Sequence, residues 1–222
     1  SCGRPEERPN IITVAWAGTV CSSPAMVSIS VRKERYSYDI LKETGEFVIN
    51  LITRDLTYAT DFCGVRSGRD VDKFAQMHLT PLPSQHISAP GIAESPVNLE
   101  CKVTQVIPLG SHDMFLAEVL GVTVDEKYMD ENGKFHLNDA GLVAYSHGEY
   151  FELGEKLGKF GYSVAKKQAA KTESVTKSAK PSGAGKKAAS AENRTASKTE
   201  AGNRRKSASK TGSADKQKSR RK

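Results

Sequence analysis

The sequence lacks the features that mark membrane, secreted and zinc-binding proteins. No stretch comes near the roughly 20 consecutive apolar residues of a membrane-spanning helix, and none has the apolar centre of a secretory signal peptide. The four cysteines form no CxxC pair and no Cys/His group with zinc-ligand spacing. Widely separated thiols are typical of a reducing compartment. We therefore expect a cytoplasmic protein with no membrane contact, no metal site and reduced, mostly buried thiols.

The sequence also lacks the common glycine-rich motifs that bind nucleotides. The segment "GVRSGRDVDK" at residues 64–73 has glycines and basic residues, but the GxxxxGK[ST] spacing of a phosphate-binding loop fails. No GxGxxG motif lies at a strand-to-helix turn. A nucleotide or flavin bound by this chain is therefore held by neither a P-loop nor a Rossmann motif.

Aromatic residues are missing from residues 166–222, where Val175 is the one large aliphatic residue. Of the 33 basic and 26 acidic residues of the chain, 18 and 4 lie in this segment, which leaves 15 and 22 in residues 1–165. Such a composition buries too little apolar surface to offset the entropy cost of ordering the chain. We predict one folded domain at residues 1–165 and a disordered, basic, Lys/Ala/Ser-rich tail at residues 166–222.

Strand-forming segments dominate residues 1–165. We expect strands at residues 11–17 and 26–32, joined by a turn at "GTVCSSP", and a third strand at residues 46–52. Further β-type runs cover residues 97–110, 113–130 and 141–154, and Asn132-Gly133 is a strong signal for a tight hairpin turn.

Helices are few and short in this reading. One is expected at residues 37–44, with Ser37 as its N-cap and Gly45 as its stop. Others are expected at residues 54–64 and around Lys73. Many strands without βαβ alternation favour a mainly β fold, a β-barrel with helical decoration.

The single tryptophan precedes a run of small and polar residues, "WAGTVCSSP". Glycine and serine weaken a strand interior, so this composition calls for an explanation. Taken alone, Trp16 is most simply a core aromatic residue and the small residues a loose turn. The alternative is that the small residues let a flat ligand approach the backbone closely.

Four segments, taken together and in order, resemble the flavin reductase-like family, and within it the flavoredoxins. They are "GRPEERPNIITVAWAGTVCSSPAMVSISVRKERYSYDILKETGEFVINL", "DFCGVRSGRDVDKF", "LECKVTQVIPLGSHDMFLAEV" and "GEYFELGEKLGKFGYSV". The resemblance covers residues 3–165. It implies an FMN-binding split β-barrel, usually a homodimer with the flavin near the subunit interface.

The resemblance also implies a set of cofactor-binding residues. The small residues after Trp16 would bring backbone N–H groups to the edge of the isoalloxazine ring, with Trp16 as a flat neighbour. Ser37, Arg32 and neighbouring residues would face the phosphate, and His112 would lie near the ring as a possible catalytic group. The expected cofactor-binding residues are Asn10, Trp16, Ala17, Gly18, Thr19, Ser30, Arg32, Ser37, Lys73, His112 and Tyr145.

Each of these residues can also be explained without a cofactor. Most lysines are solvated, a serine at a helix start is explained by capping alone, and a loop histidine such as His112 needs no function. Asn10 reads equally as a turn residue. The hydroxyl of Tyr145 would need a polar partner or solvent.

The implied function is an NAD(P)H-dependent flavin reductase, in which the nicotinamide gives a hydride to flavin N5. The electrons then pass to free flavin, a partner protein or another acceptor. An electron-transfer flavoprotein that uses NAD(P)H poorly is the first alternative. A second is a non-catalytic flavin-fold module whose basic tail binds nucleic acid in a salt-dependent, sequence-indifferent way.

Two features depart from the family pattern. Family members carry a strand ahead of the "GRP" segment, and the sequence as given, which begins at Ser1, does not contain it. We therefore expect an unpaired strand edge. The long basic tail is the second departure.

Overall fold

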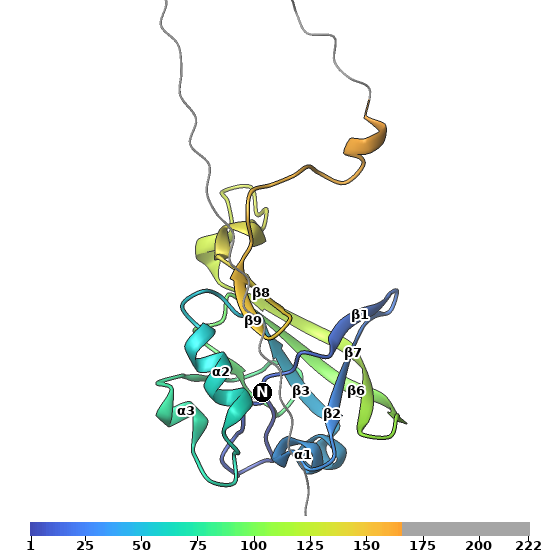
Figure 1. Cartoon of the computed structure of the whole chain (residues 1–222), viewed down its shortest axis with the longest axis vertical. Coiled ribbons are helices and arrows are strands. Elements are labelled where there is room, and N and C mark those ends of the chain that lie inside the picture. Colours follow the sequence, from blue (N-terminus) through green and yellow to red (C-terminus); the bar gives the residue numbers. More distant parts are fainter. Residues whose placement is uncertain (166–222) are drawn as a thin grey trace, which may run out of the picture. The chain divides into compact units, whose positions relative to one another are not determined.

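The structure is a computed structural model that describes residues 1–165. One antiparallel sheet, with the strand order β1-β2-β7-β6-β3, forms its centre (Figure 1). The strands are β1 Ala17–Ser22, β2 Ala25–Arg32, β3 Glu46–Asn50, β6 Val97–Pro108 and β7 His112–Val124. Two short sheets accompany it, β4 Pro81–Leu82 with β5 Gly91–Ile92, and β8 Val143–Ser146 with β9 Glu149–Glu152.

The helices are short and lie between strands. They are α1 Tyr36–Thr44, α2 Thr57–Val65 and α3 Lys73–Gln76, with 3-10 turns η1 Glu126–Tyr128, η2 Leu137–Ala140 and η3 Tyr162–Val164. Helix α1 ends at Gly45, whose φ of 64° is left-handed, as the sequence predicts. None of the helices in the described part of the chain is long and apolar enough to cross a membrane. The predicted mainly β fold with a few short helices is confirmed.

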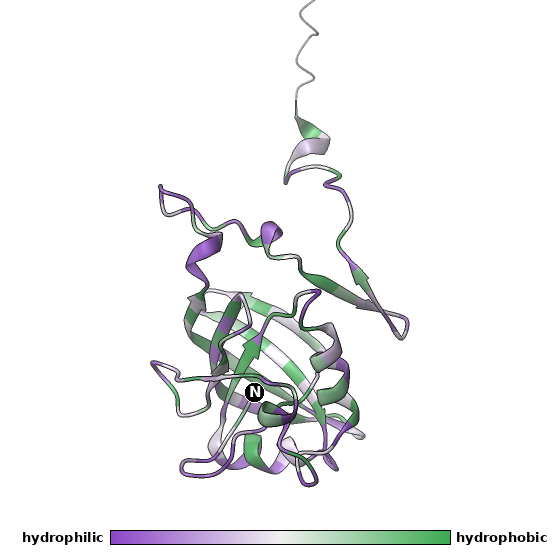
Figure 2. Cartoon of the chain, turned by 90° about the vertical axis from the view of Figure 1, so that its left-hand side faces the viewer, coloured by the Kyte–Doolittle hydropathy of each residue, from purple (hydrophilic) through white to green (hydrophobic). Residues whose placement is uncertain are grey.

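The core lies on one face of the sheet. Burial alternates along β2, so that Val27, Ile29 and Val31 point inward, and Phe115 and Ala117 of β7 meet them. In Figure 2 the strands of the central sheet carry hydrophobic residues in alternation with less hydrophobic ones. The register between β6 and β7 shifts after Glu100 and after Val103, and such bulges increase the local twist of a sheet.

The first predicted strand is wrong in its position. The structure begins β1 at Ala17 and continues it to Ser22, through the residues expected to form the turn, while the turn itself falls at Ser23-Pro24. Pairing with β2 outweighs the poor strand propensity of Gly18 and Ser22, because that propensity depends strongly on context. Residues 11–16 belong to no strand. The predicted turn at Gly133 is present, closed by a single bridge between Met129 and Phe135.

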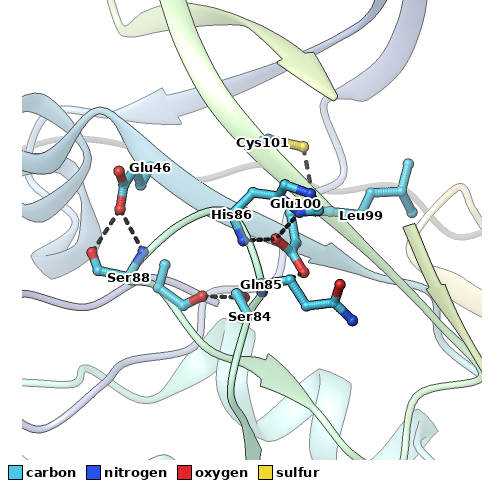
Figure 3. Close-up of polar contacts among 9 residues, drawn as sticks. Glu46, Ser84, Gln85, His86, Ser88, Leu99, Glu100 and Cys101 are labelled. Carbon is cyan, nitrogen blue, oxygen red and sulfur yellow. Dashed lines mark hydrogen bonds and ion pairs between the residues drawn. The ribbon is translucent and has the colours of Figure 1, made fainter. Parts of the chain in front are cut away.

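Two carboxylates hold the loop before β5 against the sheet (Figure 3). Glu100 is buried and accepts hydrogen bonds from the backbone N–H groups of Gln85, at 3.0 Å, and His86, at 2.7 Å. Glu46 accepts from the backbone N–H of Ser88, at 2.9 Å. Burial by itself would raise the pKa of Glu100, but the hydrogen bonds from Gln85 and His86 hold it below its ordinary value.

All four cysteines are free thiols, and three of them are buried, which confirms that prediction. The predicted disorder and nucleic-acid binding of residues 166–222 lie outside the described residues. The predicted domain boundary after residue 165 stays a prediction.

Candidate functional site

A polar hollow with a volume of about 220 Å³ lies between residue 10, the start of α1 and the α2–α3 loop. We call it the polar basin. It brings together Asn10, Ser37 and Lys73, three of the predicted cofactor residues that are far apart in sequence. Its lining residues are Asn10, Ile12, Glu34, Arg35, Tyr36, Ser37, Cys63, Val65, Arg66, Ser67, Gly68, Arg69 and Lys73.

The floor of the basin is a buried hydrogen bond. Asn10 and Ser37 are 4% and 1% exposed, and the Asn10 side-chain Nδ2 donates to Ser37 Oγ at 2.7 Å. The predicted N-cap role of Ser37 is wrong, because the N-cap is Arg35 and Ser37 lies within α1. Its hydroxyl is engaged by Asn10, a partner that local sequence rules cannot reveal. The plain turn reading of Asn10 is also excluded, since a buried amide paired to a helix connects two elements.

Lys73 lies at the end of the basin with a buried ammonium group. It is 4% exposed, and its Nζ donates to the backbone carbonyls of Ile11, at 2.6 Å, and Cys63, at 2.7 Å. Burial lowers the pKa of the Lys73 amine. The solvated-lysine reading is therefore excluded. Lys73 ties residue 11 to helix α2 and leaves one N–H for a further acceptor.

The rim of the basin is basic, and sequence reasoning missed most of it. Arg69 lies over the Tyr36 ring, 5.5 Å from its centroid, and Arg35 donates to the carbonyl of Gly64 at 3.2 Å. Arg66 and Ser67 complete the rim. The sequence signal for this basic rim was the "VRSGR" segment at residues 65–69. It lacks the spacing of a P-loop, but it supplies two arginines and a serine hydroxyl.

Gly68 is required where this segment turns. A Cβ atom at residue 68 would overlap the side-chain amide of Asn10 and lie 2.7 Å from the Tyr36 ring. Glycine therefore lets the loop close onto the floor of the basin. Arg8 adds a further tie, because its guanidinium donates to the Gly68 carbonyl at 2.8 Å.

A second group of predicted residues meets at the end of the large sheet. The Trp16 and His112 rings lie edge to face, with centroids 6.4 Å apart, and His112 Nδ1 is 2.9 Å from Ser111 Oγ. Trp16 is 68% exposed, so its reading as a core aromatic is wrong. We call Trp16, His112 and the neighbouring β1 strand the aromatic ledge.

Strand β1 presents an open surface beside Trp16. Every residue of β1 is exposed, and a Cβ atom added to Gly18 would meet no atom within 4 Å. The predicted residues Ala17, Gly18 and Thr19 therefore offer backbone to a flat ligand. Their packing within the described residues does not require them to be small.

Ser30 and Arg32 lie beside the ledge and do not line the basin. The Ser30 backbone N–H donates to the Trp16 carbonyl at 2.9 Å, and Arg32 is the register partner of His112. The Arg32 guanidinium is exposed and pairs with Glu34 at 3.1 Å. The backbone N–H of Arg35 donates to the Arg32 carbonyl at 3.1 Å, so one tight turn joins the ledge to the basin.

A buried carboxylate next to His112 holds α1 against the sheet. Asp113 Oδ2 accepts from the Tyr38 hydroxyl at 2.6 Å, and Lys33 lies 3.3 Å from Oδ1. The Tyr38 hydrogen bond, followed by the Lys33 charge, lowers the pKa of Asp113. The relative position of α1, which carries Ser37, and His112 is fixed by this contact.

The structure places Tyr145 in neither the polar basin nor the aromatic ledge. It lies on β8, is 53% exposed, and its ring contacts Tyr150 at a centroid distance of 5.2 Å. Within residues 1–165 of one copy, Tyr145 lines neither the basin nor the ledge.

The arrangement suits a flat, anionic cofactor. The basin offers cations and hydroxyl groups of the kind that bind phosphate, and the ledge offers an exposed indole and an open strand to a planar ring. Flavin mononucleotide has both parts. The residues present therefore fit the predicted FMN group.

Comparisons with known proteins agree with this geometry. The model of the flavin reductase like domain matches residues 1–154. The structure of flavoredoxin from Desulfovibrio vulgaris (Miyazaki F) is 34% identical, with a TM-score of 0.69 over 74% of this chain and 89% of that chain. An FMN-binding protein from Thermus thermophilus, solved with bound 1-cyclohex-2-enone, is 24% identical, with a TM-score of 0.60 over 70% of this chain and 85% of that one.

A protein of Archaeoglobus fulgidus is 32% identical over 145 residues, which are 65% of this chain and 81% of that protein. A solved structure from Shewanella frigidimarina with a split barrel domain is 21% identical, with a TM-score of 0.65 over 72% of this chain and 82% of that chain. The predicted split-barrel fold is therefore confirmed. With a matched family model over most of the described residues, the chain belongs to the flavin reductase like family.

Proposed function

We propose that the protein is an FMN-binding flavin reductase that accepts electrons from NAD(P)H. The observation that carries this proposal is the junction of the basic basin with the exposed Trp16–His112 ledge through the turn from Arg32 to Arg35. FMN, when bound, supplies the chemistry of hydride acceptance at its ring.

The residues of this chain would bind and orient. Arg35, Arg66 and Arg69 would neutralise the phosphate. Trp16 would cover part of the ring, and open β1 backbone groups would donate to its polar edge. His112, whose Nδ1 faces Ser111, would present its other ring nitrogen and thereby stabilise negative charge near the ring.

The test begins with an absorbance spectrum of the desalted full chain after incubation with FMN. We expect retained flavin, with binding weakened by Arg69→Ala. Binding should be unchanged by Lys102→Ala, whose side chain pairs with Glu46 at the start of β3. Oxidation of NADH or NADPH with excess FMN then tests the reductase activity. A protein that never retains FMN would overturn the cofactor assignment.

The similarity to flavoredoxin supports a second candidate, an electron-transfer flavoprotein. Bound flavin that dithionite reduces, without oxidation of either pyridine nucleotide, would favour this candidate over the reductase.

A further inference from the structure

Asp113 is a buried carboxylate that the cofactor assignment does not use. It is 4% exposed, and its Oδ2 accepts a hydrogen bond from the Tyr38 hydroxyl at 2.6 Å. Its Oδ1 is buried, receives no hydrogen bond from residues 1–165, and lies 3.3 Å from the Lys33 ammonium. A buried charge is costly and adds little net stability even when it is paired. Such a contact specifies one arrangement of the elements that it joins more than it stabilises them.

Helix α1 carries both a wall of the polar basin and the partner of this carboxylate. Its first three residues are consecutive, but they contact different parts of the fold. The Tyr36 ring lies under Arg69 of the basin rim. The Ser37 hydroxyl accepts from Asn10 in the basin floor, whereas Tyr38 contacts the sheet. A movement of the first turn of α1 against the sheet therefore moves the basin.

Asp113 is connected to the aromatic ledge through the backbone of β7. It follows His112, the first residue of the strand, and successive side chains of a strand point to opposite faces. Asp113 and Phe115 lie on the core face, where the Tyr38 ring meets Phe115 edge to face at a centroid distance of 5.9 Å. His112 lies on the other face with Trp16. The start of β7 therefore carries the ledge on one face and the anchor of α1 on the other.

The connection between β2 and α1 does not fix this geometry by itself. Residues 32–35 are all exposed, and one backbone hydrogen bond of 3.1 Å joins the two ends of the turn. Asp113 adds a contact to each part, with Lys33 in the turn and with Tyr38 in the helix. Since Tyr38 and Asp113 are 75 positions apart in the sequence, their hydrogen bond ties α1 to a distant strand.

We propose that Asp113, acting through Tyr38, is a positioning residue that sets the separation between the polar basin and the aromatic ledge. The proposal rests on the assignment of FMN to these two places. A ligand with a phosphate and a planar ring gains from both places only when their separation matches its own length. Binding of one part then raises the effective concentration of the other.

The consequence is a preference for FMN over flavins without a phosphate. Neither Asp113 nor Tyr38 lines the polar basin. Loss of their contact therefore leaves the affinity of each separate place unchanged and weakens only a ligand that spans both.

The test compares FMN with ligands that occupy one place each. Fluorescence quenching of Trp16, the single tryptophan of the chain, measures the dissociation constants of FMN and riboflavin for the full chain. Ribose 5-phosphate, titrated as a competitor of FMN, reports on the basin. We expect Tyr38→Phe to weaken FMN binding about tenfold and to change the binding of the other two ligands by less than about twofold.

Tyr150→Phe is the matched control. It removes the other tyrosine–aspartate hydrogen bond of residues 1–165, between Tyr150 and Asp61 at 3.3 Å, and should bind all three ligands like the parent. Tyr38→Phe keeps the ring that packs on Phe115 but leaves the carboxylate without its donor. If this variant fails to fold, the double change Tyr38→Phe and Asp113→Leu replaces it, because removing both partners leaves no buried polar group unpaired. The same loss of FMN preference is expected.

An equal loss of affinity for all three ligands would show a merely structural role for the contact and overturn the proposal. Unchanged FMN binding in Tyr38→Phe, an equal loss in Tyr150→Phe, or a parent chain that binds riboflavin as tightly as FMN would also overturn it. These results leave the cofactor assignment standing. A parent chain that binds neither flavin overturns that assignment and this proposal together.

Discussion

Lys73 shows how one residue can belong both to the framework and to the site. Its ammonium group donates hydrogen bonds to two backbone carbonyls that are far apart in the sequence, and Lys73 also lines the polar basin. Buried carbonyls need partners, and an ion that supplies two hydrogen bonds is costly to remove. Lys73 therefore holds the basin together, whatever it contributes to the cofactor.

Replacing Lys73 by Met tests this structural role. We expect Lys73→Met to lower the free energy of unfolding by about 3 kcal/mol, since two carbonyls lose a charged donor. Lys102→Met makes the same chemical change at a surface pair and should cost less than about 1 kcal/mol. Denaturant unfolding of both variants provides the measurement. An equal loss of unfolding free energy in the two variants would contradict the structural role of Lys73.

Trp16 provides the opposite case, an aromatic residue that contributes little to packing. Because it is 68% exposed, we expect Trp16→Ala to change the unfolding free energy by less than about 0.5 kcal/mol. FMN affinity should fall about tenfold through loss of the aromatic contact. Fluorescence titration with FMN measures this change. Tyr58→Ala, an exposed aromatic residue of α2, is the control and should leave the affinity unchanged.

At the scale of elements, the stability contributed by the contacts of Glu46 and Glu100 with the loop before β5 depends on pH. The pKa of Glu100 is lower in the folded chain than its ordinary value, so the carboxylate contributes stability above its unfolded pKa, about 4.3. This stability is lost as the pH falls through the lower, folded pKa. Burial by itself would likewise raise the pKa of Glu46, but hydrogen bonds from Lys102 and Ser88 hold it below its ordinary value.

We expect Glu100→Gln to lower the unfolding free energy by about 2 kcal/mol at pH 7, because a charged acceptor of two backbone N–H groups becomes neutral. The gap between parent and variant should narrow as the pH falls below 4. Urea unfolding at several pH values measures it. A gap that stays constant with pH would show that the carboxylate charge is not responsible, and Glu43→Gln, at an exposed pair, serves as the control.

At the scale of the whole molecule, large apolar residues are exposed toward the end of the described chain. They follow or belong to an isolated two-stranded sheet, which is marginally stable alone. A monomer rarely exposes so many together. The residues are Tyr145, Phe151, Leu153, Leu157, Phe160, Tyr162 and Val164.

We propose that these residues form the contact surface of the expected homodimer. We expect light scattering to find the full chain as a dimer at micromolar concentration. The double change Leu157→Ser and Phe160→Ser should shift it toward monomer without altering its circular dichroism, because both side chains are almost fully exposed in one copy. A parent chain that is monomeric, or a variant that stays dimeric, would contradict this role for the segment.

The sequence by itself determined the class of the fold. Alternating apolar runs predict β strands and Gly45 predicts the end of α1, since these are local preferences of backbone and side chain. The order of four segments along the chain indicated the family. The division between residues 1–165 and the basic tail rests on composition alone and stays a prediction.

Only the tertiary structure decided how these residues are used. Strand pairing with β2 placed β1 over residues whose own propensity predicts a turn. The buried Ser37 hydroxyl accepts a hydrogen bond from Asn10, which is 27 positions away in the sequence. The buried Lys73 ammonium donates to the carbonyl of Ile11, which is 62 positions away. Such long-range contacts leave no mark in local propensity.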